Sequence, residues 1–323
     1  MPVDPARTVQ EWLANADNSD AAWLFRDVLH RQMAKPDWLD NSVMQVIARN
    51  QGTALSRVVS MVRQVVADEG GLVAKKDQDL NPEAPDFDDR ISDFIAELVG
   101  VIYLNKNGFS NFRFLPAGDK PTPDLRMRKG EDEYFAEVKN LRAPNSPTTV
   151  AFSRWHRRRI EEPDRFNFEV LIDFLSLIEP DVDKEQANAL RQFVDSLPER
   201  QRPCEFELQL PKNMKLRISI KDGPPVMASH GTGGALDPLR DTRTQTFLYK
   251  VLDVSSKGLR QLYAPHLDRG LSRLLLLRWN VPDDAWLVAG EIRDGVRDSL
   301  NTMLAAHFPR LEVHILNNTD DLD

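Results

Sequence analysis

The residues of this 323-residue chain best suited to chemistry are two acids and a lysine, Asp124, Glu137 and Lys139. They belong to two short runs with alternating apolar residues, 124–128 and 134–141, joined by the turn-forming residues 129–132. The alternation puts Glu137 and Lys139 on one strand face, and a hairpin would bring Asp124 next to Glu137. Adjacent carboxylates need a counter-charge, and a hard divalent cation with oxygen ligands is the usual one. We therefore predict a site for Mg²⁺ or Mn²⁺ beside Lys139.

The order of the elements makes this pattern more specific than any one dipeptide. Pro-Asp occurs at positions 36, 85, 123, 163, 180 and 282, so the dipeptide alone carries little information. Lys139, in contrast, is the only lysine of the chain with an acid two residues before it. A predicted helix with Glu97, the pair Gly108-Phe109 and a predicted strand come before the two runs. A motif within such a context predicts a function better than the motif alone.

Pro123-Asp124 followed by Glu137-Val138-Lys139 resembles the PD-(D/E)XK signature of the nuclease superfamily with the restriction-endonuclease-like fold. The preceding helix, the Gly108-Phe109 pair and the strand resemble archaeal Holliday-junction resolvases. The resemblance covers residues 88–142 well and the part after 245 loosely. It implies an α/β protein with a restriction-endonuclease-like core, in which helices flank a mixed central sheet.

The resemblance also implies metal-dependent hydrolysis of phosphodiester bonds by an endonuclease of repair, recombination or defence. DNA is the expected substrate, and RNA is the alternative. Asp124, Glu137 and the Val138 carbonyl would be metal ligands. Lys139 would hold or deprotonate the attacking water and neutralise the phosphate. Glu97 would complete the catalytic set, binding a second metal directly or through water.

Two other functions are compatible with the same residues. The chain could be a nucleic-acid-binding or assembly subunit that keeps the nuclease fold without turnover, although its complete set of core residues argues against this. It could also be a globular interaction protein in which Glu137 and Lys139 form an ordinary surface ion pair. Cleavage and binding assays with several nucleic acids would distinguish the three functions.

Basic and aromatic residues outside the motif are candidates for nucleic-acid contact. Arginines surround one aromatic residue in a short segment, which suits a phosphate clamp with a stacking group: Arg154, Trp155, Arg157, Arg158 and Arg159. Such a run is often a solvated helix face instead. In the resembled family the helix after the catalytic strand often presents a Lys or Gln to the site, so Lys257 and Gln261 are candidates, with ordinary surface residues as the alternative.

Composition limits the setting in which the protein works. The net charge of −8 argues mildly against nucleic-acid binding, but residues 101–160 carry 12 Lys and Arg against 6 Asp and Glu. The single cysteine, Cys204, indicates a reducing compartment. The N-terminus lacks a signal-peptide pattern, and no apolar run is long enough to span a bilayer. We expect a cytoplasmic protein without a membrane partner.

Periodicity predicts the elements that must position the site. We expect a helical N-terminal domain at 1–75, a linker at 76–87 within a charged, proline-containing stretch that starts at 71, and a nuclease core formed by 88–150 and 245–317. In the core, helices are predicted from 88 to about 107, at 245–263 and at 292–307, and strands at 274–279, 286–289 and 313–316.

An insertion is expected at 151–244, between the two parts of the core. A helical part is predicted at 166–197, and a pair of strands at 205–210 and 215–221. The insertion could supply substrate specificity or the surface of a homodimer.

Overall fold

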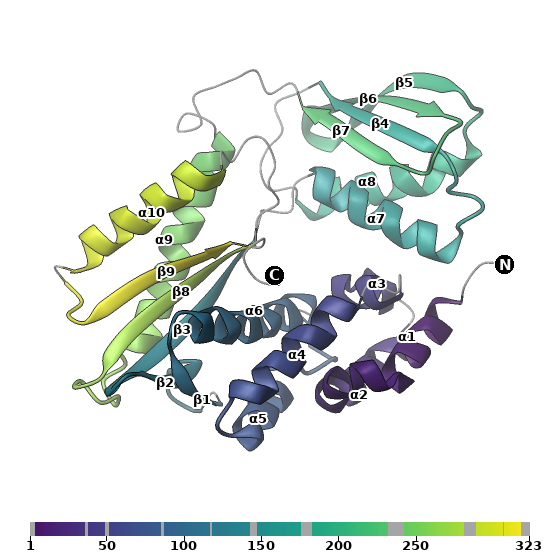
Figure 1. The fold of residues 1–323 in the computed structure, drawn as a ribbon. Coiled ribbons are helices and arrows are strands. Elements are labelled where there is room, and N and C mark those ends of the chain that lie inside the picture. The colour runs from purple at the N-terminus through teal and green to yellow at the C-terminus, as the bar shows by residue number, and fades with distance from the viewer. Residues whose placement is uncertain are drawn as a thin grey trace. The chain divides into compact units, whose positions relative to one another are not determined.

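Figure 1 shows the computed structural model of the chain, which describes residues 4–35, 38–48, 52–84, 87–116, 118–142, 147–175, 183–231, 242–280, 289–305 and 307–317. Within these residues, ten α-helices and two mixed β-sheets form a mixed α/β protein, which confirms the predicted α/β class. No helix in these ranges combines the length and the apolar character needed to cross a bilayer.

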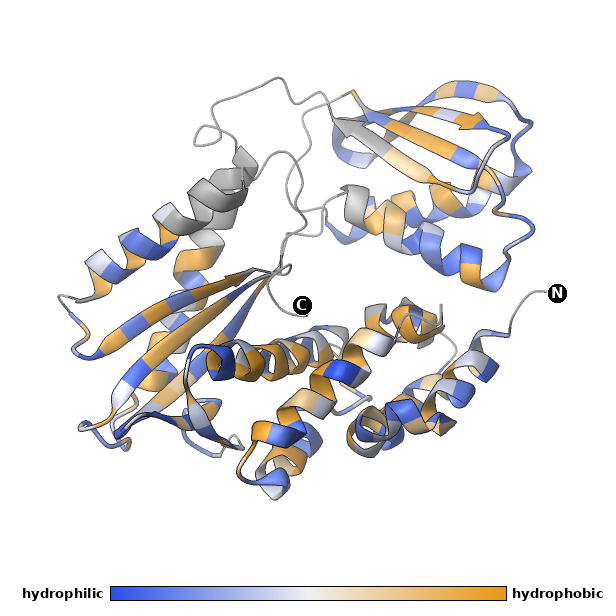
Figure 2. Cartoon of the chain, viewed as in Figure 1, coloured by the Kyte–Doolittle hydropathy of each residue, from blue (hydrophilic) through white to orange (hydrophobic). Residues whose placement is uncertain are grey.

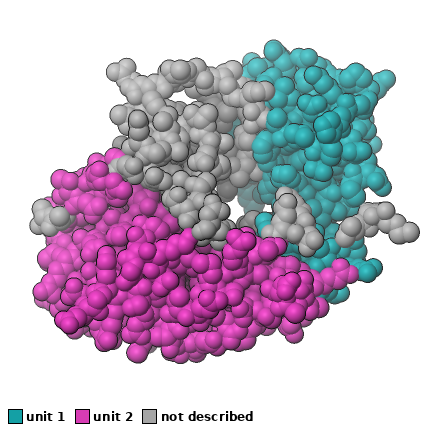
Figure 3. Space-filling view, viewed as in Figure 1, with its two compact units in different colours: residues 1–10, 36–50, 143–247 teal, residues 11–35, 51–142, 248–323 magenta. Residues whose placement is uncertain are grey.

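The chain divides into two compact units (Figure 3). Unit 1 comprises residues 1–10, 36–50 and 143–247, and unit 2 comprises residues 11–35, 51–142 and 248–323. Most of the expected N-terminal domain, including residues 51–75, therefore groups with the sheet that carries Asp124 and Glu137. The expected insertion forms most of unit 1.

In the described part of the chain before the first strand there are six α-helices. They are α1 (Pro5–Ala14), α2 (Ser19–Met33), α3 (Ser42–Ala48), α4 (Thr53–Val65), α5 (Glu69–Asp79) and α6 (Phe87–Lys106). In unit 2, α2 packs on α4 and α4 packs on α6. α6 is apolar along most of its length (Figure 2), and Phe94, Leu98 and Ile102 on it are buried, as the periodicity predicts. Gly108 follows with a left-handed φ of 84°, which a glycine adopts without strain.

The sheet of unit 2 has the order β1-β2-β3-β8-β9. Its strands are β1 (Ser110–Phe114), β2 (Leu125–Lys129), β3 (Asp132–Arg142), β8 (Ser272–Asn280) and β9 (Leu311–Asn317). β1, β2 and β3 are antiparallel, whereas β3, β8 and β9 run parallel. Parallel neighbours need crossover connections, and helices α9 (Thr242–Leu262) and α10 (Ala289–Ala305) lie in those connections.

Helices cover both faces of this sheet. A Cβ added at Gly100 of α6 would lie 2.9 Å from Leu276 Cδ2, and one added at Gly258 of α9 would lie 2.7 Å from Leu275 Cδ1. Successive strand residues point to opposite faces, so α6 and α9 cover different faces. α10 packs against β9, on the same side as α9 in Figure 1. The buried run Leu274–Leu277 is accordingly the centre of the core, as predicted.

Helix α5 corrects the predicted linker. Residues 71–79 are helical, because Asp68 caps the helix by accepting a hydrogen bond from the Gly70 N–H (2.9 Å). Gly70 and Gly71 are therefore in the first turn of α5 and do not end the preceding helix. A Cβ at Gly71 would lie 3.0 Å from the Phe114 carbonyl oxygen, so the glycine allows α5 to approach β1 closely.

Unit 1 is built around a second sheet, of order β5-β6-β4-β7. Its elements are α7 (Pro147–Glu161), β4 (Glu169–Phe174), α8 (Lys184–Ser196), β5 (Cys204–Leu210), β6 (Met214–Lys221) and β7 (Met227–Gly231). The predicted strand pair is confirmed as β5 and β6. The helical prediction for 166–197 is correct only for its second half, because 169–174 form the strand β4. The short apolar stretch at 170–172 within it fits a buried strand as well as a helix, so spacing alone could not decide.

The core of unit 1 is separate from the sheet of unit 2. It consists of residues from α7, α8 and the strands, with Trp155, Phe166 and Phe168 as its aromatic centre. The Trp155 ring meets the rings of Phe166 and Phe168 edge to face, with centroids 5.3 and 5.0 Å away.

The remaining predictions concern the end of the chain. The helices predicted at 245–263 and 292–307 are confirmed as α9 and α10, and the strands at 274–279 and 313–316 as β8 and β9. The strand predicted at 286–289 falls on residues 286–288, which lie outside the described residues, and on Ala289, which begins α10.

Candidate functional site

The β2–β3 hairpin positions the two acids of the motif. Leu125 pairs with Ala136 in the antiparallel register, so Asp124 and Glu137 follow at the next opposing positions. Gly130 in the turn has a φ of 61°, which suits a tight hairpin. The Asp124 carboxylate accepts a hydrogen bond from the Val138 backbone N–H at Oδ2 (2.9 Å). Asp124 and Glu137 therefore lie close together, as predicted.

Lys139 lies between the acid of its own strand and helix α9. Its ammonium donates to Glu137 Oε1 and to Gln261 Oε1, the latter at 2.8 Å. The Gln261 amide in turn donates to the Thr122 carbonyl oxygen (3.2 Å), which ties α9 to the segment before Asp124. The absence of a side chain at Gly258, one turn earlier, lets α9 approach Glu137 and Lys139 closely. Lys139 and Gln261 thus lie at the site, as the sequence predicted.

Glu97 reaches the site from α6. Its side chain is buried with 6% of its surface exposed, and Asp124 and Glu137 are buried to a similar degree at 5% and 0%. Gly100, one turn after Glu97, lies against Val138 and Leu276 and brings α6 close to β3. Glu97, Asp124 and Glu137 are therefore three carboxylates from three elements in one buried cluster.

Lys75, which was not among the residues predicted for the site, lies at the centre of this cluster. Its ammonium is 2.9 Å from Asp124 Oδ1, 3.4 Å from Glu97 Oε1 and 3.0 Å from Asp79 Oδ2. Its exposure is only 5%. A buried lysine requires paired charges, and here three acids supply them. The signal in the sequence was weak, because residues 71–87 have the composition of a linker.

Burial and the two ammonium groups set the protonation of the cluster. Burial, together with the charge of Asp124, raises the pKa values of Glu97 and Glu137 well above the ordinary range. Burial would also raise the pKa of Asp124, but Lys75, Lys139 and the Val138 N–H outweigh it and lower that pKa. Burial would lower the pKa values of Lys75 and Lys139, yet the neighbouring acids raise both. Lys75, Lys139 and Asp124 are therefore charged. Glu97 and Glu137 bind protons more readily than exposed glutamates do.

Two oxygens of the cluster lack hydrogen-bond partners. Glu97 Oε2 and Glu137 Oε2 are buried and accept no hydrogen bond, which is costly for a carboxylate. Oxygen-only donors of this kind fit Mg²⁺ or Mn²⁺. In the described part of the chain, however, no three or more His, Cys, Asp or Glu residues are grouped in an arrangement that could hold a metal ion. The chemical type of the donors suits a hard cation, but their arrangement does not form a metal site, and the Lys75 ammonium lies between Asp124 and Glu97.

Lys257 does not join the site. Its ammonium pairs with Asp253 on the next turn of α9 (2.6 Å), and the lysine side chain is 55% exposed. The two candidates on α9 therefore differ, because Gln261 contacts Lys139 and Lys257 does not.

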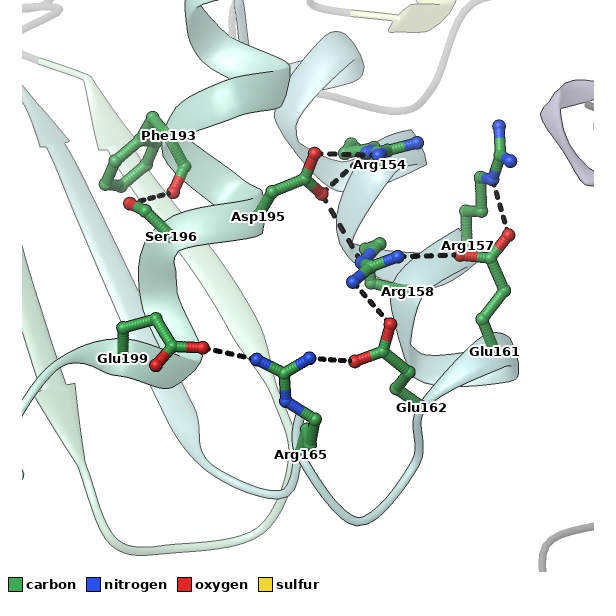
Figure 4. A network of polar contacts seen from close by, with 10 residues as sticks. All are labelled: Arg154, Arg157, Arg158, Glu161, Glu162, Arg165, Phe193, Asp195, Ser196 and Glu199. Atoms are coloured by element: carbon green, nitrogen blue, oxygen red, sulfur yellow. Dashed lines mark hydrogen bonds and ion pairs between the residues drawn. The ribbon is translucent and has the colours of Figure 1, made fainter.

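The predicted nucleic-acid contacts on α7 belong to unit 1. Trp155 is 1% exposed and lies in the aromatic centre of the core, so its predicted stacking role is wrong. Figure 4 shows Arg154, Arg157 and Arg158 facing acids at the C-terminal end of α7 and on α8. Arg154 binds Asp195 through two hydrogen bonds (2.8 and 2.7 Å), Arg157 binds Glu161 (2.8 Å), and Arg158 contacts Glu161, Glu162 and Asp195.

Arg159 donates to the Pro225 carbonyl oxygen (2.9 Å). The contacts of Arg154 and Arg158 with Asp195 tie α7 to α8. The ion pairs of Arg154, Arg157 and Arg158, all partly buried, offset much of the positive charge that suggested a phosphate clamp. The basic character of residues 101–160 is thus partly neutralised in the folded unit.

Comparison of the chain with protein-family models, with curated proteins and with solved structures gives no match. The fold defines the chain as a mixed α/β protein of two compact units. The acid cluster is the feature from which a function can be inferred.

Proposed function

We propose that this protein is a metal-dependent phosphodiesterase that cleaves DNA, with RNA as the alternative substrate. One observation carries the proposal: Glu97, Asp124, Glu137 and Lys139, predicted together from their order in the sequence, meet in one buried cluster. The order of α6, the three antiparallel strands, α9 and the parallel strand β8 supports a restriction-endonuclease-like core.

Asp124 and Glu137 would hold the cation, with the Val138 carbonyl as a further ligand and Glu97 at or beside the metal. The two unpartnered glutamate oxygens provide acceptors for this. When bound, a hard cation lowers the pKa of water and stabilises charge on phosphate oxygens. Lys139 would orient the attacking water and neutralise the phosphate, and its hydrogen bond to Gln261 would hold the ammonium in position.

A second candidate is a nucleic-acid-binding or assembly subunit that does not cleave. The specific observation in its favour is Lys75, whose ammonium already supplies a positive charge to Asp124 and Glu97. A cluster neutralised in this way can be stable without a metal. Binding of nucleic acid without cutting would favour this candidate.

Cleavage assays test the proposal. We expect the wild-type protein to cut at least one of supercoiled, linear, single-stranded or branched DNA, or RNA, with Mg²⁺ or Mn²⁺, and EDTA to stop the reaction. Asp124→Ala and Lys139→Ala should abolish cleavage, and Asp124→Asn, which preserves the side-chain volume, should do the same if Asp124→Ala folds poorly. Asp119→Ala and Lys120→Ala, two exposed residues of the preceding loop, are the matched controls and should cut normally. Undiminished cleavage by both Asp124→Asn and Lys139→Ala would remove the assignment.

A further inference from the structure

Lys75 contacts three acids at once, more than a single ion pair would provide. Its ammonium lies within 3.4 Å of carboxylate oxygens of Asp79, Glu97 and Asp124. Besides these acids, the ionisable groups that affect the cluster are Glu137 and Lys139 on β3. An ammonium among several carboxylates acts in the same direction as a bound cation, because its positive charge offsets their mutual repulsion.

The partners of Lys75 differ in their exposure. The side chains of Glu97 and Asp124 are 8% and 7% exposed, whereas that of Asp79 is 24% exposed. Asp79 lies one turn after Lys75 on the same helix, which is a favourable spacing for an ion pair. The Lys75 ammonium, 3.0 Å from Asp79 Oδ2, therefore has a partner on its own helix that does not belong to the more buried pair Asp124 and Glu97, and the lysine side chain is flexible.

We propose that Lys75 is a built-in counter-ion of the acid cluster, and that a divalent cation binds by displacing its ammonium from Asp124 and Glu97 toward Asp79. This inference rests on the proposed function, since it concerns the cation of the same site. Lys75 is thereby a positioning residue that stabilises the metal-free protein and weakens metal binding. Lys75 is therefore favourable for the free energy of the metal-free protein and unfavourable for that of the metal-bound protein.

A substitution of Lys75 separates these two effects. Lys75→Met keeps the length of the side chain and removes the charge, so Mn²⁺ should bind at least about tenfold more tightly than to the wild type in calorimetric titration. The metal-free variant should melt at a lower temperature, and saturating Mn²⁺ should raise its melting temperature more than that of the wild type. Lys76→Met is the matched control, because Lys76 is also 5% exposed but pairs with Asp27 and Asp77. It should leave Mn²⁺ affinity unchanged.

A measurement on the wild-type protein covers the case in which Lys75→Met does not fold. The lysine side-chain ammonium signals can be followed by nuclear magnetic resonance during titration with Mg²⁺. We expect the Lys75 signal to shift along with that of Lys139 and to saturate at the same Mg²⁺ concentration. A Lys75 signal that stays constant while that of Lys139 shifts would overturn the inference.

The outcomes also distinguish this inference from the proposed function. If the wild type binds Mn²⁺ and cleaves nucleic acid, but Lys75→Met binds Mn²⁺ with equal or lower affinity, Lys75 does not compete with the metal and only this inference fails. If neither protein binds Mn²⁺ and the wild type cleaves nothing, both fail. If Lys75→Met alone binds Mn²⁺, the inference is supported and the wild type is held in its metal-free form.

Discussion

The amide of Gln261 is the contact through which helix α9 orients the ammonium of Lys139. One end of the amide accepts from Lys139 Nζ, and the other donates to the Thr122 carbonyl oxygen. Gln261→Leu should lower the cleavage rate by about 10- to 150-fold, because a hydrogen bond to a charged group is worth about 1.5–3 kcal/mol. Steady-state kinetics would measure this. Lys257→Leu, on the same helix but paired with Asp253 in solvent, should retain full activity. Equal losses in the two variants would contradict the role of Gln261.

The raised pKa values of Glu97 and Glu137 predict how metal binding depends on pH. Both carboxyl groups have pKa values well above the ordinary range because of burial and the charge of Asp124, so they retain protons at a pH where an exposed glutamate is ionised. A cation needs the deprotonated form and must release these protons. Mn²⁺ affinity should therefore still rise with pH above the ordinary glutamate pKa of about 4.3, where the affinity of a site made of exposed glutamates would already have levelled off.

Calorimetry in buffers of different ionisation enthalpy would count the protons released. Glu137→Gln removes one titrating ligand, so it should bind Mn²⁺ more weakly and release fewer protons than the wild type. An affinity that does not change with pH above the ordinary glutamate pKa would contradict the prediction.

The residues of the site differ in how far their sequence positions reveal them. Asp124, Glu137 and Lys139 are close in sequence, and the alternation of a strand with a short turn is enough to bring them together. Glu97 and Gln261 are separated from them, but each lies on a helix whose apolar stripe defines the side that meets the sheet. Lys75 is neither close to these residues in sequence nor on a helix with a clear apolar stripe. Its position depends on a close approach between α5 and β1 that no local pattern encodes, so sequence reasoning could not find it.

The helices and strands that the sequence predicts correctly are those with a long apolar stripe or a clear alternation of apolar and polar residues. α6, α9, the β2–β3 hairpin and the buried strand β8 have such patterns. α5 and β4 do not. α5 has two glycines in its first turn, which usually disfavour a helix, and its formation depends on the Asp68 cap and on packing against β1. β4 is a short apolar run whose pairing with β6 and β7 decides its conformation.

Gly100 sets the distance between helix α6 and strand β3, and hence the position of Glu97. A Cβ there would lie 2.9 Å from Leu276 Cδ2 and 3.3 Å from Val138 Cγ2, both in the buried core. Gly100→Val should lower the free energy of unfolding by about 1–3 kcal/mol through overpacking, as measured by urea denaturation. Gly295→Val on α10 is the matched control, because an added Cβ there meets nothing within 4 Å. A stable Gly100→Val protein would show that α6 can move away from β3 at little cost.

The whole molecule has two compact units, and the buried aromatic residues show that each has its own core. Trp155 is central to unit 1, and Phe94 on α6 is buried in unit 2, each with 1% exposure. Trp155→Ala should destabilise unit 1 by about 3–5 kcal/mol and leave the Mn²⁺ affinity of the acid cluster unchanged. Phe94→Ala should weaken α6, β3 and β8, and with them metal binding.

Amide hydrogen exchange resolved along the chain would separate the two cases, because protection is lost first in the cooperative unit that is damaged. Trp155→Ala should raise exchange in α7, α8 and β4–β6, and Phe94→Ala should raise it in α6, β3 and β8. If Trp155→Ala instead raised exchange equally in both units and abolished Mn²⁺ binding, the two cores would form a single cooperative unit. The acid cluster would then depend on unit 1, although all of its side chains belong to unit 2.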